Sequence, residues 1–220
     1  MRDSAHVRRP DSVRVMQSYP KQTFALPALD GISPAQLAVH LDLYAGYVTN
    51  LNKLRDTEGD LMQDPERNAY ALAEVHRRLA FEFDGMRMHE IYFAQWEGQP
   101  APAVPVGPLA MALAQQFGSY EAWEHQFKAL GMRRGIGWTV LYFDAKLQVF
   151  INAWVDDHEH GQLTGLPVLL AMDMWEHAYM VDYAPAKKAD YIAAFFRNLN
   201  WSVAEQRFWT VAGQRFLKVS

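Results

Sequence analysis

The amino-acid sequence predicts an α+β protein in which a long antiparallel α-hairpin precedes a domain with a three-stranded antiparallel sheet. Three observations support this fold class. Apolar residues recur at helical spacing in two long segments, a Pro- and Gly-rich stretch interrupts all periodicity, and three short apolar runs of strand character follow it. We expect a disordered extension over 1–24, the hairpin over 25–97, a linker over 98–108 and the α+β domain over 109–220.

The two helices of the hairpin each have a start signal. Ser33 can cap the first helix, Pro34 suits its first position, and Gln36 can complete a capping box. We expect the second helix to start at Asp64-Pro65 and to continue to about Trp96, with a weak point at Gly85. Two long helices joined by a short polar turn are expected to pack as antiparallel neighbours.

The elements after the linker follow in a helix–strand–helix order. Helical patterns cover about 109–117 and 119–131, strand-like runs cover 138–143, 147–154 and 166–172, and closing helices are expected near 176–182, 187–198 and 201–212.

Composition and charge exclude several classes of function. The chain has 220 residues and no cysteine, so disulfides, thiolate metal sites and cysteine nucleophiles are excluded. A net charge of −4 argues against a general nucleic-acid binder. No apolar run reaches the roughly 20 residues that span a bilayer, and residues 1–24 lack the apolar segment of a secretory signal. We therefore expect a cytoplasmic protein without membrane or nucleic-acid partners.

The densest group of chemically active residues is Asp173-Met-Trp-Glu-His177. An Asp and a His four residues apart, just after an apolar strand, can reach one point from a strand end and a helix start. A carboxylate with imidazoles suits iron, manganese or zinc. Taken alone, the pair is equally consistent with an N-capping Asp and a surface His. A zinc-protease motif at His89-Glu90 is excluded because Phe93 stands where the second His would be, and we find no paired Glu-x-x-His motifs of di-iron proteins.

The segment DMWEHAYMVDY, residues 173–183, resembles the D-x-W-E-H-A-[FY] signature of the iron/manganese superoxide dismutases. Four further segments match that family in the same order: LPALD, Tyr47-Val-Thr-Asn-Leu-Asn52, Gly135-Ile-Gly-Trp138 and Asn200-Trp201. The likeness covers roughly residues 25–210, and the family's fold is the same helical hairpin and α+β domain.

The resemblance implies one iron or manganese ion per subunit and a superoxide dismutase activity that converts superoxide to oxygen and hydrogen peroxide in two half-reactions. The implied metal ligands are His40, His89, Asp173 and His177. It also implies that Trp138 and Trp175 form an apolar shell around the metal and that Tyr47 is the gate residue above it. The sequence does not decide between iron and manganese.

The resemblance further implies a hydrogen-bond donor to the metal-bound solvent. Gly85 occupies one of the family's two donor positions, so the donor is expected from the loop after the second strand. His158 lies fifteen residues before Asp173, as in the relatives that use a His there, and is preferred to Asp157 and His160. The alternative is that His158 and His160 are two solvated histidines in an acidic loop.

Two departures from the family bear on access and turnover. One residue is missing between His40 and Tyr47, and Leu43 or Tyr44 stands where the family carries a further His near the metal. Met180 replaces the Tyr that meets this His across the dimer interface. Loss of both leaves open a non-catalytic protein of the same fold with a structural or interaction role.

The family's assembly and substrate guidance map onto two other positions. Glu176 is retained, so we expect a homodimer or a dimer of dimers with Glu176 at the interface. Lys187 stands where the family usually has an Arg that attracts the anion, although a lysine pair such as Lys187-Lys188 is also an ordinary solvated helix start.

Overall fold

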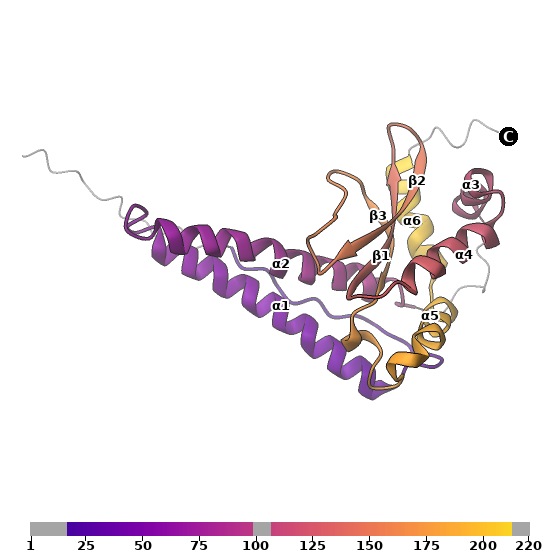
Figure 1. The fold of residues 1–220 in the computed structure, drawn as a ribbon, viewed down its shortest axis with the longest axis horizontal. Helices are drawn as coiled ribbons and strands as arrows, with labels where there is room; N and C mark the ends of the chain where they lie inside the picture. Colours follow the sequence, from indigo (N-terminus) through magenta and orange to yellow (C-terminus); the bar gives the residue numbers. More distant parts are fainter. Residues whose placement is uncertain (1–16, 99–106, 213–220) are drawn as a thin grey trace, which may run out of the picture.

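A computed structural model of the chain describes residues 17–98 and 107–212. Helices α1 (Pro34–Leu61) and α2 (Ala69–Ala94) form an antiparallel hairpin that projects from a mixed α+β body (Figure 1). The predicted fold class is confirmed. The predicted linker over 98–108 lies mostly outside the described residues, as does the extension up to residue 16.

The starts of the two hairpin helices only partly follow the prediction. Ser33 caps α1, since its Oγ accepts a hydrogen bond from the Gln36 N–H at 3.1 Å. The Gln36 side chain does not complete the capping box and bonds elsewhere. The predicted start of α2 at Asp64-Pro65 is wrong, since the helix begins at Ala69. Asp64 Oδ1 accepts from the Arg67 N–H, as a cap would, but Asn68 Nδ2 donates to the Leu61 carbonyl and ties this turn to the end of α1.

Residues 17–24, the described part of the predicted extension, lie on the hairpin. The Tyr19 N–H and C=O bond the two ends of the Asn52 side-chain amide, and the Gln22 N–H donates to the Tyr44 hydroxyl. The Phe24 ring packs against Tyr44 and Phe93. This stretch is therefore held in place by side chains of both helices.

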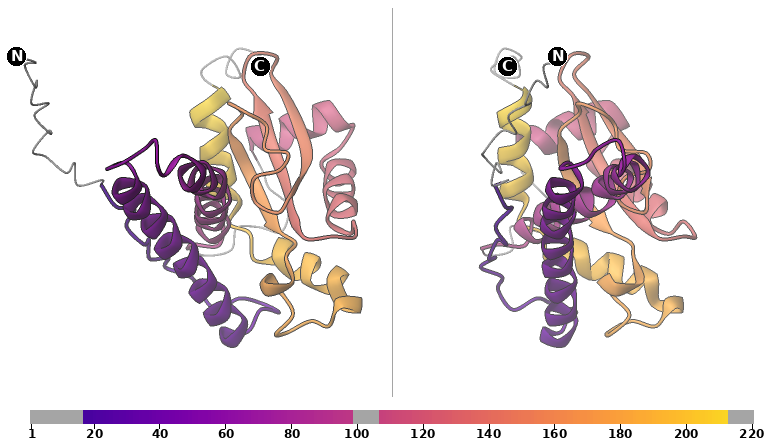
Figure 2. Two further views of the ribbon diagram at one scale, coloured as in Figure 1. Left: turned by 60° about the vertical axis from the view of Figure 1, so that its left-hand side comes forward. Right: turned by 90° about the vertical axis from the view of Figure 1, so that its left-hand side faces the viewer.

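The body contains one antiparallel sheet in the order β2-β1-β3. The chain passes through α3 (Pro108–Phe117), α4 (Tyr120–Gly131), β1 (Gly137–Asp144), β2 (Val149–Asp156) and β3 (Val168–Asp173), and closes with α5 (Lys188–Arg197) and α6 (Trp201–Ala212). α2 and α6 contact β3, whereas α4 contacts β1 and β2. The inner end of the hairpin thus meets the sheet at β3 (Figure 2).

The predicted helix over 176–182 is wrong. The segment forms one turn of 3-10 helix, η1 (Glu176–Ala178), followed by turns, and a second such turn, η2 (Pro185–Lys187), precedes α5. An α-helix would pair the Val181 N–H with the His177 carbonyl. Both groups bond the Gln36 side chain instead, at 2.9 and 2.6 Å. A contact from α1 therefore stops the helix.

The register of the sheet places a tryptophan beside the end of β3. Trp138 on β1 lies opposite Asp173 on one side and Val155 on the other. Gly137, the residue before it, has φ +144°, and a Cβ there would lie 2.2 Å from the Val155 carbonyl oxygen. This explains the second glycine of Gly135-Ile-Gly-Trp138. Among the described residues, no helix combines the length and apolarity that crossing a bilayer requires.

Candidate metal centre

The side chains of His40, His89, Asp173 and His177 meet where the hairpin joins the sheet. His40 comes from α1, His89 from α2, Asp173 from the end of β3 and His177 from η1. One nitrogen from each His and one carboxylate oxygen lie within 4.8 Å of one another. Asp173 Oδ2 lies 3.0 Å from His40 Nε2, 3.1 Å from His177 Nε2 and 3.5 Å from His89 Nε2.

The His89 ring is set up to offer a lone pair to a metal ion. Its Nδ1 donates to the Gly85 carbonyl at 2.6 Å, which places the ring proton on that nitrogen. Its Nε2 is buried and has no hydrogen-bond partner. A buried polar atom left without a partner is costly, and a metal ion would satisfy it. The donor set therefore fits a mononuclear iron or manganese ion.

The charges of the group also fit a cation. Burial lowers the pKa of His40 and His89, which favours the neutral imidazoles that bind metals. Burial alone would raise the pKa of Asp173, but His177 and His40 beside it hold that pKa well below its usual range. One carboxylate thus remains ionised in a buried place, where it needs a compensating positive charge.

Three further contacts orient the ligands from β3 and η1. Asp173 Oδ1 accepts from the Trp175 N–H at 2.9 Å, which leaves Oδ2 directed at the histidines. Tyr191 donates its hydroxyl proton to the Asp173 carbonyl at 2.7 Å. Gln36 Nε2 holds the His177 carbonyl at 2.6 Å. Sequence reasoning assigned Gln36 only to helix capping and did not identify Tyr191, because both act through contacts that are distant in the chain.

The preferred donor, His158, is fully buried beside the ligands. Its ring stacks on Trp175 at 4.9 Å and lies 5.8 Å from the His89 ring. The Trp138 Nε1–H donates to His158 Nδ1 at 3.0 Å, and His158 Nε2 lies 2.6 Å from the Tyr47 hydroxyl oxygen. Burial lowers the pKa of His158 to about 4, so the ring is neutral at neutral pH with its proton on Nε2.

The loop geometry explains why His158, and not its neighbours, faces inward. Asp156 and His160 pair backbone to backbone, and Asp157 at the tip adopts a φ of +50°. The Asp157 carbonyl accepts from Trp175 Nε1–H at 3.1 Å. The side chains of Asp157 and His160 are 39% and 69% exposed and pair with each other. The reading of His158 as a solvated surface histidine is wrong.

Tyr47 lies flat against α2 at Gly85. A Cβ on Gly85 would be only 2.6 Å from Tyr47 Cδ1, so the tyrosine ring fills the space that a side chain would take. From the sequence, Gly85 is only a donor position without a donor side chain. In the structure, Tyr47 fills the space beside Gly85 and in turn contacts His158.

The two positions that depart from the family pattern face away from these contacts. The Tyr44 hydroxyl is bonded to Glu90 and to the Gln22 N–H. Met180 is 46% exposed. Glu176 is exposed, and Lys187 is exposed and pairs with Asp190 at 3.5 Å. Among residues 17–98 and 107–212, the side chains of Tyr44, Met180, Glu176 and Lys187 make no hydrogen bond or ion pair with the four ligand side chains.

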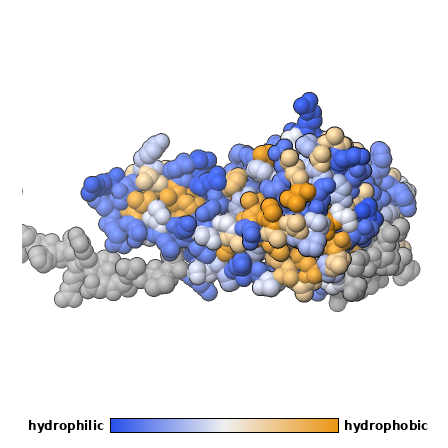
Figure 3. Space-filling view, turned by 90° about the horizontal axis from the view of Figure 1, so that it is seen from below, coloured by the Kyte–Doolittle hydropathy of each residue, from blue (hydrophilic) through white to orange (hydrophobic). Residues whose placement is uncertain are grey.

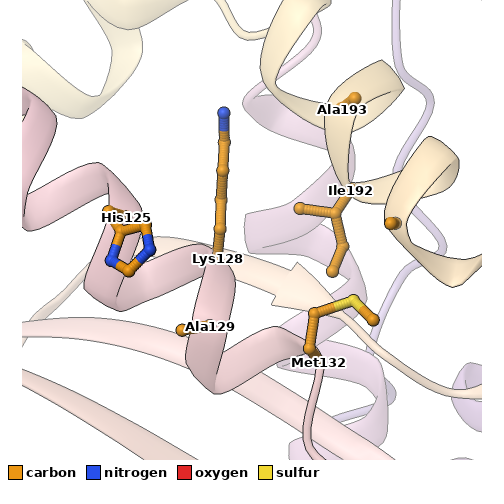
Figure 4. Close-up of a pocket in the computed structure, with 7 residues that line it drawn as sticks. His125, Lys128, Ala129, Met132, Ile192 and Ala193 are labelled. Carbon is orange, nitrogen blue, oxygen red and sulfur yellow. The ribbon is translucent and has the colours of Figure 1, made fainter.

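Two apolar surface features lie outside this centre. A pocket of about 430 Å³ between α4 and α5 is lined mainly by small and apolar side chains, with Met132 and Ile192 facing each other and Lys128 extending along its side (Figure 4). Apolar side chains also gather on one face of the molecule, over the hairpin and over the body (Figure 3).

Comparisons with known proteins point to one family. A model of the C-terminal domain of iron/manganese superoxide dismutases matches residues 105–207. A relative named iron superoxide dismutase from Cupriavidus metallidurans is 34% identical over 82% of this chain and 90% of its own length. One named manganese superoxide dismutase 2 from Haloferax volcanii is 33% identical over 80% of this chain and 87% of its own length. A relative named iron superoxide dismutase from Sulfolobus acidocaldarius is 33% identical over 86% of this chain and 92% of its own length.

Proposed function

The chain belongs to the iron/manganese superoxide dismutase family, and from this premise we propose that His40, His89, Asp173 and His177 hold one iron or manganese ion in a working enzyme. The function is that of a superoxide dismutase, which converts two superoxide anions into oxygen and hydrogen peroxide. The observation that carries the proposal is the convergence of three imidazole nitrogens and one carboxylate oxygen around the unpaired Nε2 of His89.

When bound, the metal supplies a one-electron couple that accepts an electron from one superoxide and returns it to the next. The protein residues supply the rest of the environment. Burial favours the neutral form of His40 and His89, Gln36 holds the His177 carbonyl, and Asp173 is the one carboxylate of the ligand set. This set stabilises a cation in a place from which bulk water is excluded.

We propose that His158 and Tyr47 handle the protons of the reaction. Formation of hydrogen peroxide from superoxide takes up two protons as well as one electron. His158 accepts from Trp138 at Nδ1, so its Nε2 carries a proton that it shares with the Tyr47 oxygen. The raised pKa of Tyr47, mainly due to burial, keeps that hydroxyl protonated. Because the His158 Nε2–H is donated to the Tyr47 oxygen, the Tyr47 hydroxyl hydrogen is the one that can point toward a solvent molecule or substrate beside the ligands.

Trp138 and Trp175 act as positioning residues in this proposal. Trp138 fixes the tautomer of His158, and its ring meets His89 edge-on at 5.1 Å. Trp175 stacks between His158 and His177 at 4.9 and 5.5 Å. Both rings exclude water and restrict the histidines to one orientation.

We further propose a homodimer in the cytoplasm. Glu176, Met180 and Val181 are exposed on the segment that carries His177, and the two apolar side chains are 46% and 51% exposed. A two-fold contact through this segment would bring Glu176 of one protomer close to the partner's His177. Sedimentation at micromolar concentration tests this, and a monomer would contradict it.

Metal content and superoxide dismutation, measured on protein grown with iron or with manganese, test the proposed function. We expect about one ion per chain and activity with at least one of the two metals. His89→Ala should lose both. His76→Ala, a histidine on the same helix whose side chain is 56% exposed, should retain both. A protein that binds the metal without dismuting superoxide would contradict the enzymatic proposal.

A further inference from the structure

We propose that Arg78 is the cation that draws the superoxide anion toward the site, an inference that rests on the proposed function. Arg78 lies on α2, eleven residues before His89, so both side chains fall on one face of the helix. The sequence had suggested Lys187 for this role. The contacts of the two residues favour Arg78.

The guanidinium of Arg78 is stacked directly outside the proton-handling pair. Its Cζ lies 3.8 Å from the centre of the Phe81 ring. Phe81 in turn packs edge-on against His158 at 4.7 Å and lies tilted to the Tyr47 ring at 5.9 Å. The charge is therefore within about 9 Å of the His158 ring, the upper limit that the Cζ–Phe81 and Phe81–His158 distances set.

A buried carboxylate fixes the guanidinium in this position. Glu82 Oε1 accepts a hydrogen bond from the Arg78 Nε–H at 3.0 Å, and Arg78 Nη2 lies 2.9 Å from the same oxygen. The Glu82 side chain is only 5% exposed, whereas that of Arg78 is 42% exposed. The pair consequently presents its positive end to water and its negative end to the interior. A superoxide anion that approaches from solvent meets the cation first.

One cation with a fixed orientation has a marked effect here because its surroundings are negatively charged. The whole chain carries a net charge of −4, and two of its acidic residues, Asp157 and Glu159, lie in the neighbouring loop. Lys187 is paired with Asp190, and their side chains are 67% and 58% exposed, so this pair has no buried partner or ring to orient it. Ion pairs of that exposed kind are weakly held.

The expected effect is local and moderate. A unit charge at about 9 Å, acting through a medium between water and protein surface, changes the concentration of a monovalent anion by about two- to tenfold. Salt should suppress the effect, because the Debye length is about 8 Å at physiological ionic strength.

Arg78→Gln and Arg77→Gln form a matched pair for the test. Both remove one positive charge from adjacent residues, but Arg77 is 64% exposed and pairs with Glu74. Two quantities would be measured on metal-loaded protein at low and high salt. They are the second-order rate constant for superoxide and the dissociation constant of azide, followed by absorbance. At low salt we expect Arg78→Gln to lower the rate constant and to raise the azide dissociation constant, each by about two- to tenfold. Arg77→Gln should stay within about 1.5-fold of wild type, and Arg78→Lys should recover most of the loss.

Equal losses in Arg78→Gln and Arg77→Gln would overturn the inference, because only net charge would then matter. A loss in Arg78→Lys as large as that in Arg78→Gln would also overturn the inference, since the shape of the side chain would then matter and its charge would not. Lys187→Gln, measured in the same way, would have the larger effect if the sequence-based assignment were right, and that result too would contradict the inference. Wild-type protein without metal or activity would instead refute the proposed function, which separates the two failures.

Discussion

Gly85→Ala should impair turnover through Tyr47 while leaving the metal ligands intact. The new Cβ would lie 2.6 Å from Tyr47 Cδ1, 2.8 Å from Cε1 and 3.0 Å from Cγ. Ordinary contacts of this kind begin at 3.4 Å, so the ring must retreat by about 0.8 Å. Because the Tyr47 hydroxyl is held at 2.6 Å from His158 Nε2, that movement stretches or breaks the hydrogen bond.

Two opposing effects set the stability of this variant. Alanine in a helix interior stabilises by about 0.5–1 kcal/mol relative to glycine. Overpacking a buried contact costs about 1–3 kcal/mol. We therefore expect a net loss of up to about 2 kcal/mol in the free energy of unfolding. Loss of one outer contact to a metal site typically costs about 10–100-fold, and we expect turnover to fall within that range with metal content unchanged.

Gly46→Ala is the matched control. Gly46 lies in α1, and a Cβ there would meet nothing within 4 Å. This variant should gain about 0.5–1 kcal/mol and keep its turnover. Urea unfolding and a dismutation assay measure both quantities. If Gly85→Ala behaved like Gly46→Ala in both, the argument that Tyr47 fills the space at Gly85 and works through His158 would be refuted.

Three further outcomes are expected. His158→Gln should keep the metal and lose about 10–100-fold in turnover, whereas His160→Gln, at a 69% exposed neighbour, should match wild type. In metal-free protein, burial lowers the pKa of His158 from 6.5 to about 4, so between these pH values the unfolded state binds more protons and the free energy of unfolding falls as pH drops. Urea unfolding of His158→Gln should show a fall that is smaller by up to about 3 kcal/mol. An identical fall in the wild type and in His158→Gln would contradict the buried neutral ring. Gln36→Leu leaves the His177 carbonyl and the Val181 N–H unpaired, so it should weaken metal affinity and lower the free energy of unfolding by about 1–3 kcal/mol. Gln63→Leu, at an exposed position, should change neither quantity when metal titration and urea unfolding are compared.

The sequence predicted the fold class because helical and strand periodicity are local patterns, and the four ligands were implied by the resemblance of several segments to the family. His40 and His89 lie on helices with clear periodicity, and Asp173 ends an apolar strand. The missing residue between His40 and Tyr47 did not disturb the arrangement, because the offset of seven residues keeps both on one face of α1.

The errors come from contacts between segments that are far apart in the chain. The helix expected over 176–182 does not form because the side chain of Gln36, over 140 residues earlier, bonds the backbone carbonyl and N–H that such a helix would pair with each other. The space beside Gly85 is filled by the ring of Tyr47 from the other helix. Phe81 and Arg78 carry no motif, and only the packing of α2 against the loop of His158 reveals them.

Element-specific anomalous X-ray scattering from crystals of metal-loaded protein tests the central claim most directly. We expect one iron or manganese peak per chain, at about 2.0–2.2 Å from one nitrogen each of His40, His89 and His177 and from one carboxylate oxygen of Asp173. A peak at any other place, or His40 turned away from it, would contradict the account.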